Sequence, residues 1–203
     1  MDPITCFFLK PTDLFCRSLR RFKWSDSGDV CKDHGYHNAV VRTGIAIQRP
    51  NCEYDGIVQD DWPHDDPRWP LECSCGYVFQ EDDPWQHILT RMYSRADDPT
   101  VMMTTEDAPP GATFFANWRT HEVGLDGNTV MVVLPGGHRW CPDGRASNCT
   151  RPKDKVHKCW CRHGTPPDPI TVDKLGNTCD AGAGSIQVPG WHGFLRDGKL
   201  VQC

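Results

Sequence analysis

Residues 157–163 read His157-Lys158-Cys159-Trp160-Cys161-Arg162-His163, so four possible metal ligands alternate with three other side chains. Alternate residues of a β-strand share one face, and the stretch therefore predicts a strand with its ligands on one side. At about 3.3 Å per residue the two histidines would lie about 20 Å apart, whereas zinc–ligand bonds are only about 2.0–2.3 Å long. One ion can take an adjacent pair from this stretch, and other segments must supply the remaining ligands.

Further cysteines on either side can complete a zinc site with this stretch. Cys149 lies in a loop rich in Asn, Ser and Thr, and Cys179 follows a turn at residues 174–177. We predict a zinc site formed by Cys149, Cys159, His163 and Cys179. Alternative ligands for the same site are Cys141, Cys161 and His157.

A second group of possible ligands lies earlier in the chain. Cys73-Ser74-Cys75-Gly76 is a tight knuckle, in which the glycine lets backbone amides turn toward a thiolate sulfur. We predict a second zinc site from Cys52, Cys73 and Cys75, with His34 or Cys31 as the fourth ligand. The alternative interpretation is that these residues are small buried thiols, which are common in protein cores.

The chain contains 12 cysteines and 9 histidines, which indicates either a disulfide framework or metal ligands. Metal is favoured because histidines lie beside the cysteines and the first residues do not have a secretory pattern: Lys10 and Pro11 end a short apolar run. No stretch approaches the roughly 20 apolar residues of a membrane span. We therefore expect one to two zinc ions per chain as the cofactor, and no membrane span.

Composition predicts a small, mostly β fold that is rich in turns and stabilised by zinc. The 18 Gly and 17 Pro among 203 residues exceed the average share of roughly 12%, which disfavours long helices. Strands are expected at residues 39–49, 129–134, 170–173, 185–188, 191–195 and 199–202, and turns at 125–128 and 197–198.

One short helix is expected near residues 84–95, which would make the fold α+β. Asp83 is a suitable N-cap and Pro84 suits the first helical position. Apolar residues recur at helical spacing in Trp85, Ile88, Leu89 and Met92.

The organisation expected from the sequence is an N-terminal arm with a first strand (residues 1–50) and a Cys/His-rich zinc-binding β domain (residues 51–203). The arm mixes aromatic and basic residues, so it either packs on its own core or docks on another subunit. Residues 51–100 contain 3 Arg and 12 acidic residues, which would repel a phosphate backbone. General nucleic-acid binding is therefore not expected.

Motifs that define an enzyme are missing from the sequence. HExxH, HxE with a later PCxxC, and GxSxG do not occur, and the glycine-rich stretch 181–185 lacks the Lys-Ser/Thr pair of a phosphate loop. We expect no catalytic residues and no enzymatic activity. A cysteine nucleophile with a histidine base is the open alternative, because those partners need only be close in space.

Three long stretches, residues 73–95, 137–167 and 178–200, resemble an uncharacterised family of Cys/His-rich proteins encoded by tailed bacteriophages. The family has no assigned reaction. The resemblance implies a non-enzymatic structural and interaction protein, a minor head, tail or decoration component located in the virion after assembly in the host cytoplasm. Its expected partners are other phage structural proteins or further copies of itself. The alternatives are an intracellular host-takeover or anti-defence protein that binds a bacterial protein, and a small zinc metalloenzyme.

Overall fold

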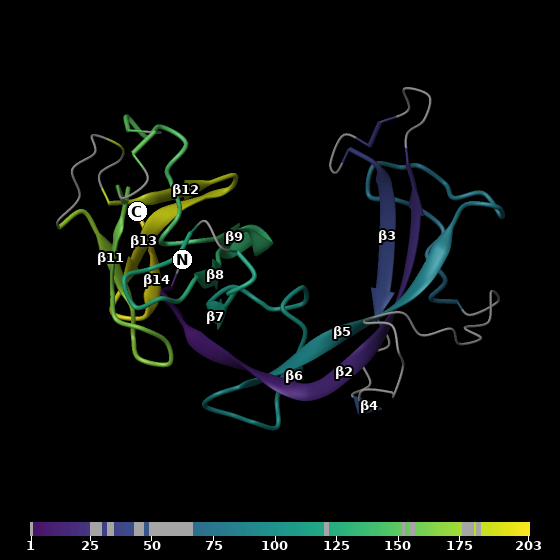
Figure 1. The fold of residues 1–203 in the computed structure, drawn as a ribbon, viewed down its shortest axis with the longest axis horizontal. Helices are drawn as coiled ribbons and strands as arrows, with labels where there is room; N and C mark the ends of the chain where they lie inside the picture. The colour runs from purple at the N-terminus through teal and green to yellow at the C-terminus, as the bar shows by residue number, and fades with distance from the viewer. Residues whose placement is uncertain are drawn as a thin grey trace. The chain divides into compact units, whose positions relative to one another are not determined.

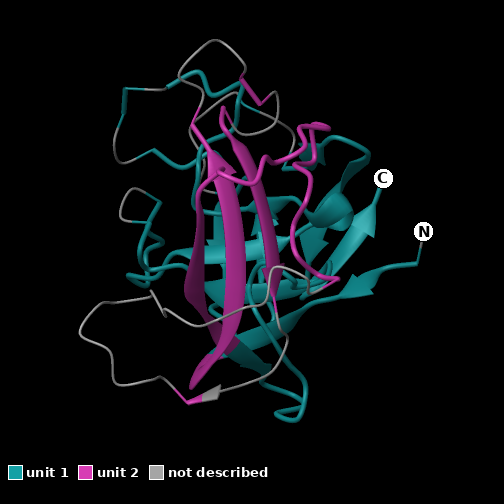
Figure 2. Cartoon of the chain, turned by 90° about the vertical axis from the view of Figure 1, so that its right-hand side faces the viewer, with its two compact units in different colours: residues 1–10, 93–203 teal, residues 11–92 magenta. Residues whose placement is uncertain are grey.

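A computed structural model describes residues 2–24, 30–31, 35–42, 47–48, 67–119, 122–151, 153–154, 157–175, 181 and 184–203. The chain divides into two compact units (Figure 2). Unit 1 comprises Met1–Lys10 and Tyr93–Cys203, and unit 2 comprises Pro11–Met92. The regular secondary structure of the described residues is almost entirely β-strand, which confirms the mostly β fold class. No helix among the described residues is long and apolar enough to cross a membrane.

Unit 1 contains an antiparallel sheet that joins residues from both ends of the sequence. Its strand order is β1 (Ile4–Thr5), β14 (Lys199–Gln202), β13 (Trp191–Arg196) and β12 (Ile186–Val188). Ile4 pairs with Leu200, and β13 and β14 form a hairpin (Figure 1). The hairpin turns at Asp197 and Gly198, which have φ values of 46° and 66°, as a two-residue type I′ turn requires.

A second set of strands in unit 1 surrounds β8 (Val130–Val133). Here β8 pairs with β7 (Ala112–Phe115) and β9 (Arg139–Trp140), and β7 runs parallel to the first residues of β2 (Phe7–Lys23). The short 3-10 helix η1 (Pro135–Gly137) connects β8 to β9. A separate two-stranded sheet is formed by β10 (Cys161–His163) and β11 (Thr171–Asp173).

The core of unit 1 lies on both faces of β8. Val130 and Val132 pack against Ile186, Leu195 and other residues of the β12–β14 sheet. Met131 and Val133 face the opposite side and pack with a cluster that includes Phe114. All four residues of β8 are buried, so the strand is a continuous apolar run rather than an alternating one.

Unit 2 is a sheet built on the remainder of β2. Here β2 pairs with β3 (His37–Arg42), β4 (Ile47–Gln48) and β5 (Trp85–Arg95), and its pairing with β3 runs from Ser18–Arg42 to Lys23–His37. Its described apolar clusters are small: one joins Leu19 and Trp69, and the other is centred on Phe79 beside two cysteines. The last residues of β5 belong to unit 1, where they pair with β6 (Met102–Met103).

The predicted helix at 84–95 is wrong, because these residues form strand β5. Trp85, which begins the apolar stripe, is 39% exposed, whereas His87, outside the stripe, is buried. Pairing with β2 overrides the helical spacing: the Phe22 N–H donates to Pro84 O, and the hydroxyls of Ser18 and Thr90 share a hydrogen bond. The fold is therefore β without the α-helix.

The domain boundaries also differ from those expected. Residues of the predicted arm, 1–50, form β1 and β2, which pair with strands of their own chain in both units. The described residues of this segment thus belong to sheets of both units, and the two units are divided at 10/11 and 92/93. A strand is found in each of the ranges predicted at 39–49, 129–134, 170–173, 185–188, 191–195 and 199–202, with ends that differ by at most two residues among those described.

Replacing Leu195 tests whether the β8-centred core stabilises unit 1. The Leu195 side chain has no exposed surface, so Leu195→Ala leaves a cavity and should cost about 2–5 kcal/mol of unfolding free energy. Leu125→Ala is the matched control, because Leu125 is fully exposed and its truncation should change stability by less than about 0.5 kcal/mol. Urea denaturation measures both, and equal losses would contradict the described packing.

Candidate metal centres

Unit 2 brings together four possible ligands, Cys31, His37, Cys73 and Cys75, here called the Cys31 group. Their ligand atoms all lie within 4.8 Å of one another. His37 begins β3, where the pairing with Lys23 fixes its position. Cys73 and Cys75 come from a knuckle closed by the bridge between Glu72 and Val78. The first three ligands are buried, and Cys75 lies at the surface.

Two distances within this group are close to those expected around a tetrahedral metal ion. With metal–sulfur bonds of about 2.3 Å and metal–nitrogen bonds of about 2.0–2.1 Å, tetrahedral angles place two sulfurs about 3.8 Å apart and a sulfur and a nitrogen about 3.5 Å apart. The sulfurs of Cys31 and Cys73 are 3.7 Å apart, and His37 Nδ1 lies 3.2 Å from Cys75 Sγ. A disulfide would need sulfurs at about 2.05 Å.

Backbone amides around Cys73 favour the thiolate, which is the form that binds metal. Burial opposes ionisation of Cys73, but hydrogen bonds from the backbone N–H groups of Cys75 and Asn38 help to lower its pKa to about 6. The Asn38 N–H lies 3.4 Å from Cys73 Sγ. Gly76 has φ of 92°, which only glycine adopts readily and which lets the knuckle turn its amides inward. The predicted role of this knuckle is consistent with these contacts.

Neighbouring side chains hold the His37 ring in place. The Tyr77 ring stacks on it, with centroids 4.0 Å apart and an interplanar angle of 16°. Tyr77 in turn donates its hydroxyl to Asp83 Oδ2 over 2.9 Å and accepts a hydrogen bond from Lys23 Nζ over 2.8 Å. Such outer contacts fix the orientation of a ligating imidazole.

Unit 1 brings together a second set of possible ligands, Cys149, His157 and Cys159, here called the Cys149 group. Their ligand atoms also lie within 4.8 Å of one another, and Cys159 Sγ is 3.6 Å from His157 Nε2. His157 and Cys159 are buried and Cys149 is half-buried. The Arg151 N–H and the Arg145 guanidinium approach Cys149 Sγ at 3.4 and 3.6 Å.

The structure joins Cys149 with Cys159 as the sequence predicts, but it places His163 elsewhere. His163 Nε2 lies 2.9 Å from Asp173 Oδ1 on the neighbouring strand β11. The reason is that the strand begins only at Cys161, so residues 157–160 lie outside it and do not alternate as strand residues do. His157, predicted as an alternative ligand, lies beside Cys159 instead. Cys179, the fourth predicted ligand, lies outside the described residues.

The other alternative ligands of this site lie apart from the Cys149 group. Cys141 is buried beside the Glu122 carbonyl, and burial raises its thiol pKa to about 11, which disfavours the thiolate. Cys161 is half-buried in β10, where burial also raises its pKa.

The sequence identified most of the Cys31 group. It named Cys73 and Cys75 as ligands and Cys31 as an alternative fourth ligand, whereas Cys52 and His34 lie outside the described residues. His37 was not selected, although its place six residues after Cys31 and at the start of an alternating strand marks it as a ligand candidate. No disulfide joins any two of the ten cysteines in the described ranges. Two Cys/His groups can therefore hold a metal ion.

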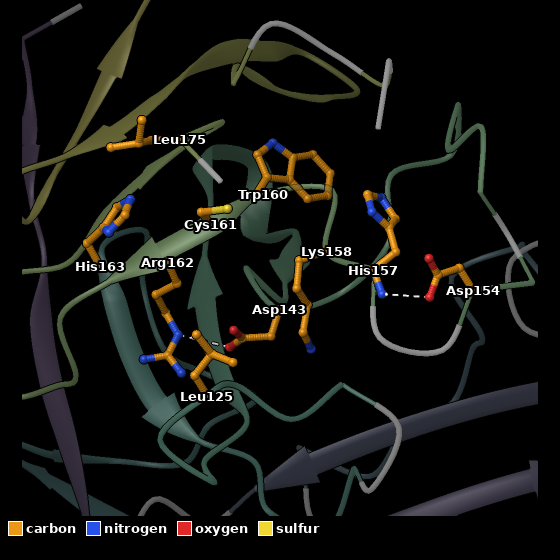
Figure 3. A pocket seen from close by; sticks show the side chains of 10 residues that line it. All are labelled: Leu125, Asp143, Asp154, His157, Lys158, Trp160, Cys161, Arg162, His163 and Leu175. Atoms are coloured by element: carbon orange, nitrogen blue, oxygen red, sulfur yellow. Dashed lines mark hydrogen bonds and ion pairs between the residues drawn. The ribbon is translucent and has the colours of Figure 1, made fainter. Parts of the chain in front are cut away.

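A cavity of about 460 Å³ lies beside the Cys149 group and is shown in Figure 3. Several polar side chains that line it form hydrogen bonds or ion pairs within the protein. Arg162, whose side chain is 4% exposed, bonds both Asp126 and Asp143, and Lys158 donates to the Val123 carbonyl. His163 pairs with Asp173 as described above, so the described charged groups of this cavity are engaged in holding the loops of unit 1 together.

The ion pair between Asp126 and Arg162 gives a pH-dependent prediction. Hydrogen bonds, first from Arg162 and then from Thr165, hold the pKa of Asp126 well below its ordinary value of about 3.8 despite partial burial. Asp126→Asn should cost about 1–3 kcal/mol at pH 7. Because the folded pKa is the lower one, this difference from the parent protein should persist above pH 3.8 and shrink as the pH falls below it.

Urea denaturation of both proteins from pH 7 to pH 3 measures this difference, and any loss of metal in acid cancels because both proteins share it. Asp97→Asn is the control, since Asp97 also pairs with an arginine, Arg95, but its side chain is 58% exposed. It should show a much smaller change. A difference for Asp126→Asn that stays constant at all pH values would contradict the assignment.

Comparison with known proteins gave no match: no family model, no curated protein and no solved structure is similar to this chain.

Proposed function

We propose that this chain is a non-enzymatic structural and interaction protein of a tailed bacteriophage, stabilised by a zinc ion in each of its two units. The observation that carries the metal part of the proposal is the Cys31 group, in which three sulfurs and one imidazole nitrogen lie within 4.8 Å of one another. Thiolate and imidazole ligands in this geometry favour zinc.

The Cys31 group supports a structural rather than a catalytic role. A catalytic zinc takes three protein ligands and keeps one position for water or substrate, whereas a structural zinc is closed by four protein ligands. Cys31, His37, Cys73 and Cys75 supply all four. No position is left at which a substrate could bind to the ion.

A bound zinc ion would also stabilise the fold of unit 2. Its described apolar clusters contain few residues, and the knuckle that carries Cys73 and Cys75 is joined to the rest of its strands by few backbone hydrogen bonds. A structural zinc contributes on the order of 10 kcal/mol to folding. The ion would fasten the knuckle and the segment around Cys31 to the start of β3.

The phage and virion parts of the proposal rest on the resemblance of residues of about 73–200 to phage-encoded proteins. A surface suited to a protein partner accompanies it. Trp24 is 58% exposed and packs with Tyr36, whose ring centroid is 4.7 Å away, and with Phe22. Exposed aromatic residues are enriched at protein interfaces. The proposed partners are other phage structural proteins or further copies of this chain, in the virion.

A small zinc metalloenzyme is the second candidate, and the Cys149 group favours it. Three ligands lie together there, and one of them, His157, lines the cavity of Figure 3. This arrangement resembles a catalytic zinc with an open position. The structural proposal is preferred because the charged groups around the cavity bind one another.

Elemental analysis of purified protein should find two zinc ions per chain. Cys73→Ser and Cys159→Ser should each remove one ion and lower the thermal unfolding temperature, because each deletes a ligand from a different unit. Cys203→Ser is the control, since Cys203 is exposed and belongs to neither group, and it should keep both ions. Folded protein without metal, or equal thermal shifts for Cys159→Ser and Cys203→Ser, would refute the proposal.

Mass spectrometry of purified virions tests the location. A virion component should be found at a fixed copy number that survives gradient purification and washing. Recovery only in the soluble fraction of infected cells, bound to a host protein, would replace this proposal with the host-takeover or anti-defence alternative.

A further inference from the structure

A second cavity in unit 1, here called the tryptophan pocket, also has a volume of about 460 Å³. Its walls come from Trp140 at the end of β9, Trp160 just before β10, the loop of residues 145–148, and residues 185–187 at the start of β12. Four separate stretches of unit 1 therefore converge on it. The volume is in the range of small-molecule sites.

The two tryptophans form a fixed aromatic wall. Their rings meet edge to face, with centroids 5.3 Å apart and an interplanar angle of 89°. The Trp160 indole N–H donates to the Ser185 carbonyl over 3.3 Å, and Trp140 pairs through its backbone with Val132 of β8. Both rings are half-buried, so each packs against the protein and keeps part of its surface for a ligand.

The polar side chains of the pocket remain available for a ligand. Asn148 and Gln187 are exposed amides, and Ser147 and Ser185 carry hydroxyls. None of these four side chains hydrogen-bonds another residue in the described part of the chain, and neither does the Trp140 indole N–H. This differs from the cavity of Figure 3, whose charged groups are paired. An amide offers both donors and an acceptor.

The charge of the pocket points to a neutral ligand. Its described lining contains no carboxylate, and its one charged residue is Arg145. The Arg145 guanidinium already donates to the carbonyls of Arg151 and Asp154 and approaches Cys149 Sγ. It is therefore engaged in shaping the loop rather than free for an anion.

We propose that the tryptophan pocket binds a neutral carbohydrate. A sugar ring has an apolar C–H face, which fits the exposed part of an indole ring, and a rim of hydroxyls that both donate and accept hydrogen bonds. Asn148, Gln187 and the two serines supply the matching donors and acceptors beside that aromatic wall. An apolar ligand would leave these polar groups dry and unpaired, which is costly.

The proposal goes beyond a zinc-stabilised structural role and does not depend on a phage origin. The pocket and the Cys149 group share one loop, because residues 145–151 include Cys149 and its hydrogen-bond donors. Metal at the Cys149 group would hold this loop, and with it the Asn148 wall of the pocket.

The test is a glycan array that carries neutral and anionic saccharides, probed with the zinc-loaded full chain. The strongest neutral hit is then titrated by calorimetry. Asn148→Ala combined with Gln187→Ala should weaken that binding about tenfold or more with an unchanged unfolding temperature, since both side chains are exposed and bond no described residue. Gln202→Ala removes an exposed amide that is not part of the pocket lining, so it is the matched control and should bind like the parent.

Trp140→Phe adds a second variant that removes the indole N–H and part of the aromatic face while it keeps an apolar ring, and it should also weaken binding. The proposal is overturned if the array shows no saccharide binding, if only anionic saccharides bind, or if the double variant and Gln202→Ala bind equally. These outcomes are distinct from failure of the structural proposal, which is judged by zinc content and stability alone.

Discussion

The convergence of sulfur and imidazole on one point is the constraint on which unit 2 depends. Like-charged thiolates 3.7 Å apart repel one another in a buried setting, so the arrangement of Cys31 and Cys73 is favourable only around a cation or with a proton retained. The surrounding contacts are built for this situation. Backbone amides face Cys73, and the Tyr77 ring covers His37, so both ligands are oriented by neighbouring groups.

The two units solve the problem of stability in different ways. Unit 1 has a strand, β8, that is buried on both faces and joins two apolar clusters, in the manner of an ordinary protein core. In unit 2 the described clusters are smaller, and aromatic rings and arginines pack against one another instead. Arg21, for example, lies over the rings of both Trp69 and Phe79. Metal ligation at a structural site supplements such packing.

Local chemistry explains which parts of the fold could be predicted from sequence. The hairpin at Asp197-Gly198 was predictable because its turn type depends on two adjacent residues, and the flanking strands followed. Strand β5 was not, since Trp85, Ile88, Leu89 and Met92 have helical spacing and only the distant partner β2 decides against a helix. The predicted metal ligands likewise divide into those set by adjacent residues and those set by distant partners.

For the metal centres, the knuckle at Cys73 and Cys75 is local and was identified, and so was the need for other segments to complete each site. Which histidine, His157 or His163, lies beside Cys159 is not decided by the neighbouring residues in the sequence. It depends on where strand β10 begins, and that is set by its pairing with β11. Sequence spacing could show that Cys159 needs a histidine close by, but not which one lies outside the strand.

The order of the two units along the chain has a consequence for synthesis on the ribosome. All residues of unit 2 are made before residue 93, so that unit can assemble while the polypeptide is still growing. Unit 1 cannot, because Ile4 must wait for Leu200, nearly the full length of the chain later, before its sheet closes. The inserted unit is thus able to fold first, and the early strand β1 stays unpaired with β14 until residues 199–200 have been made.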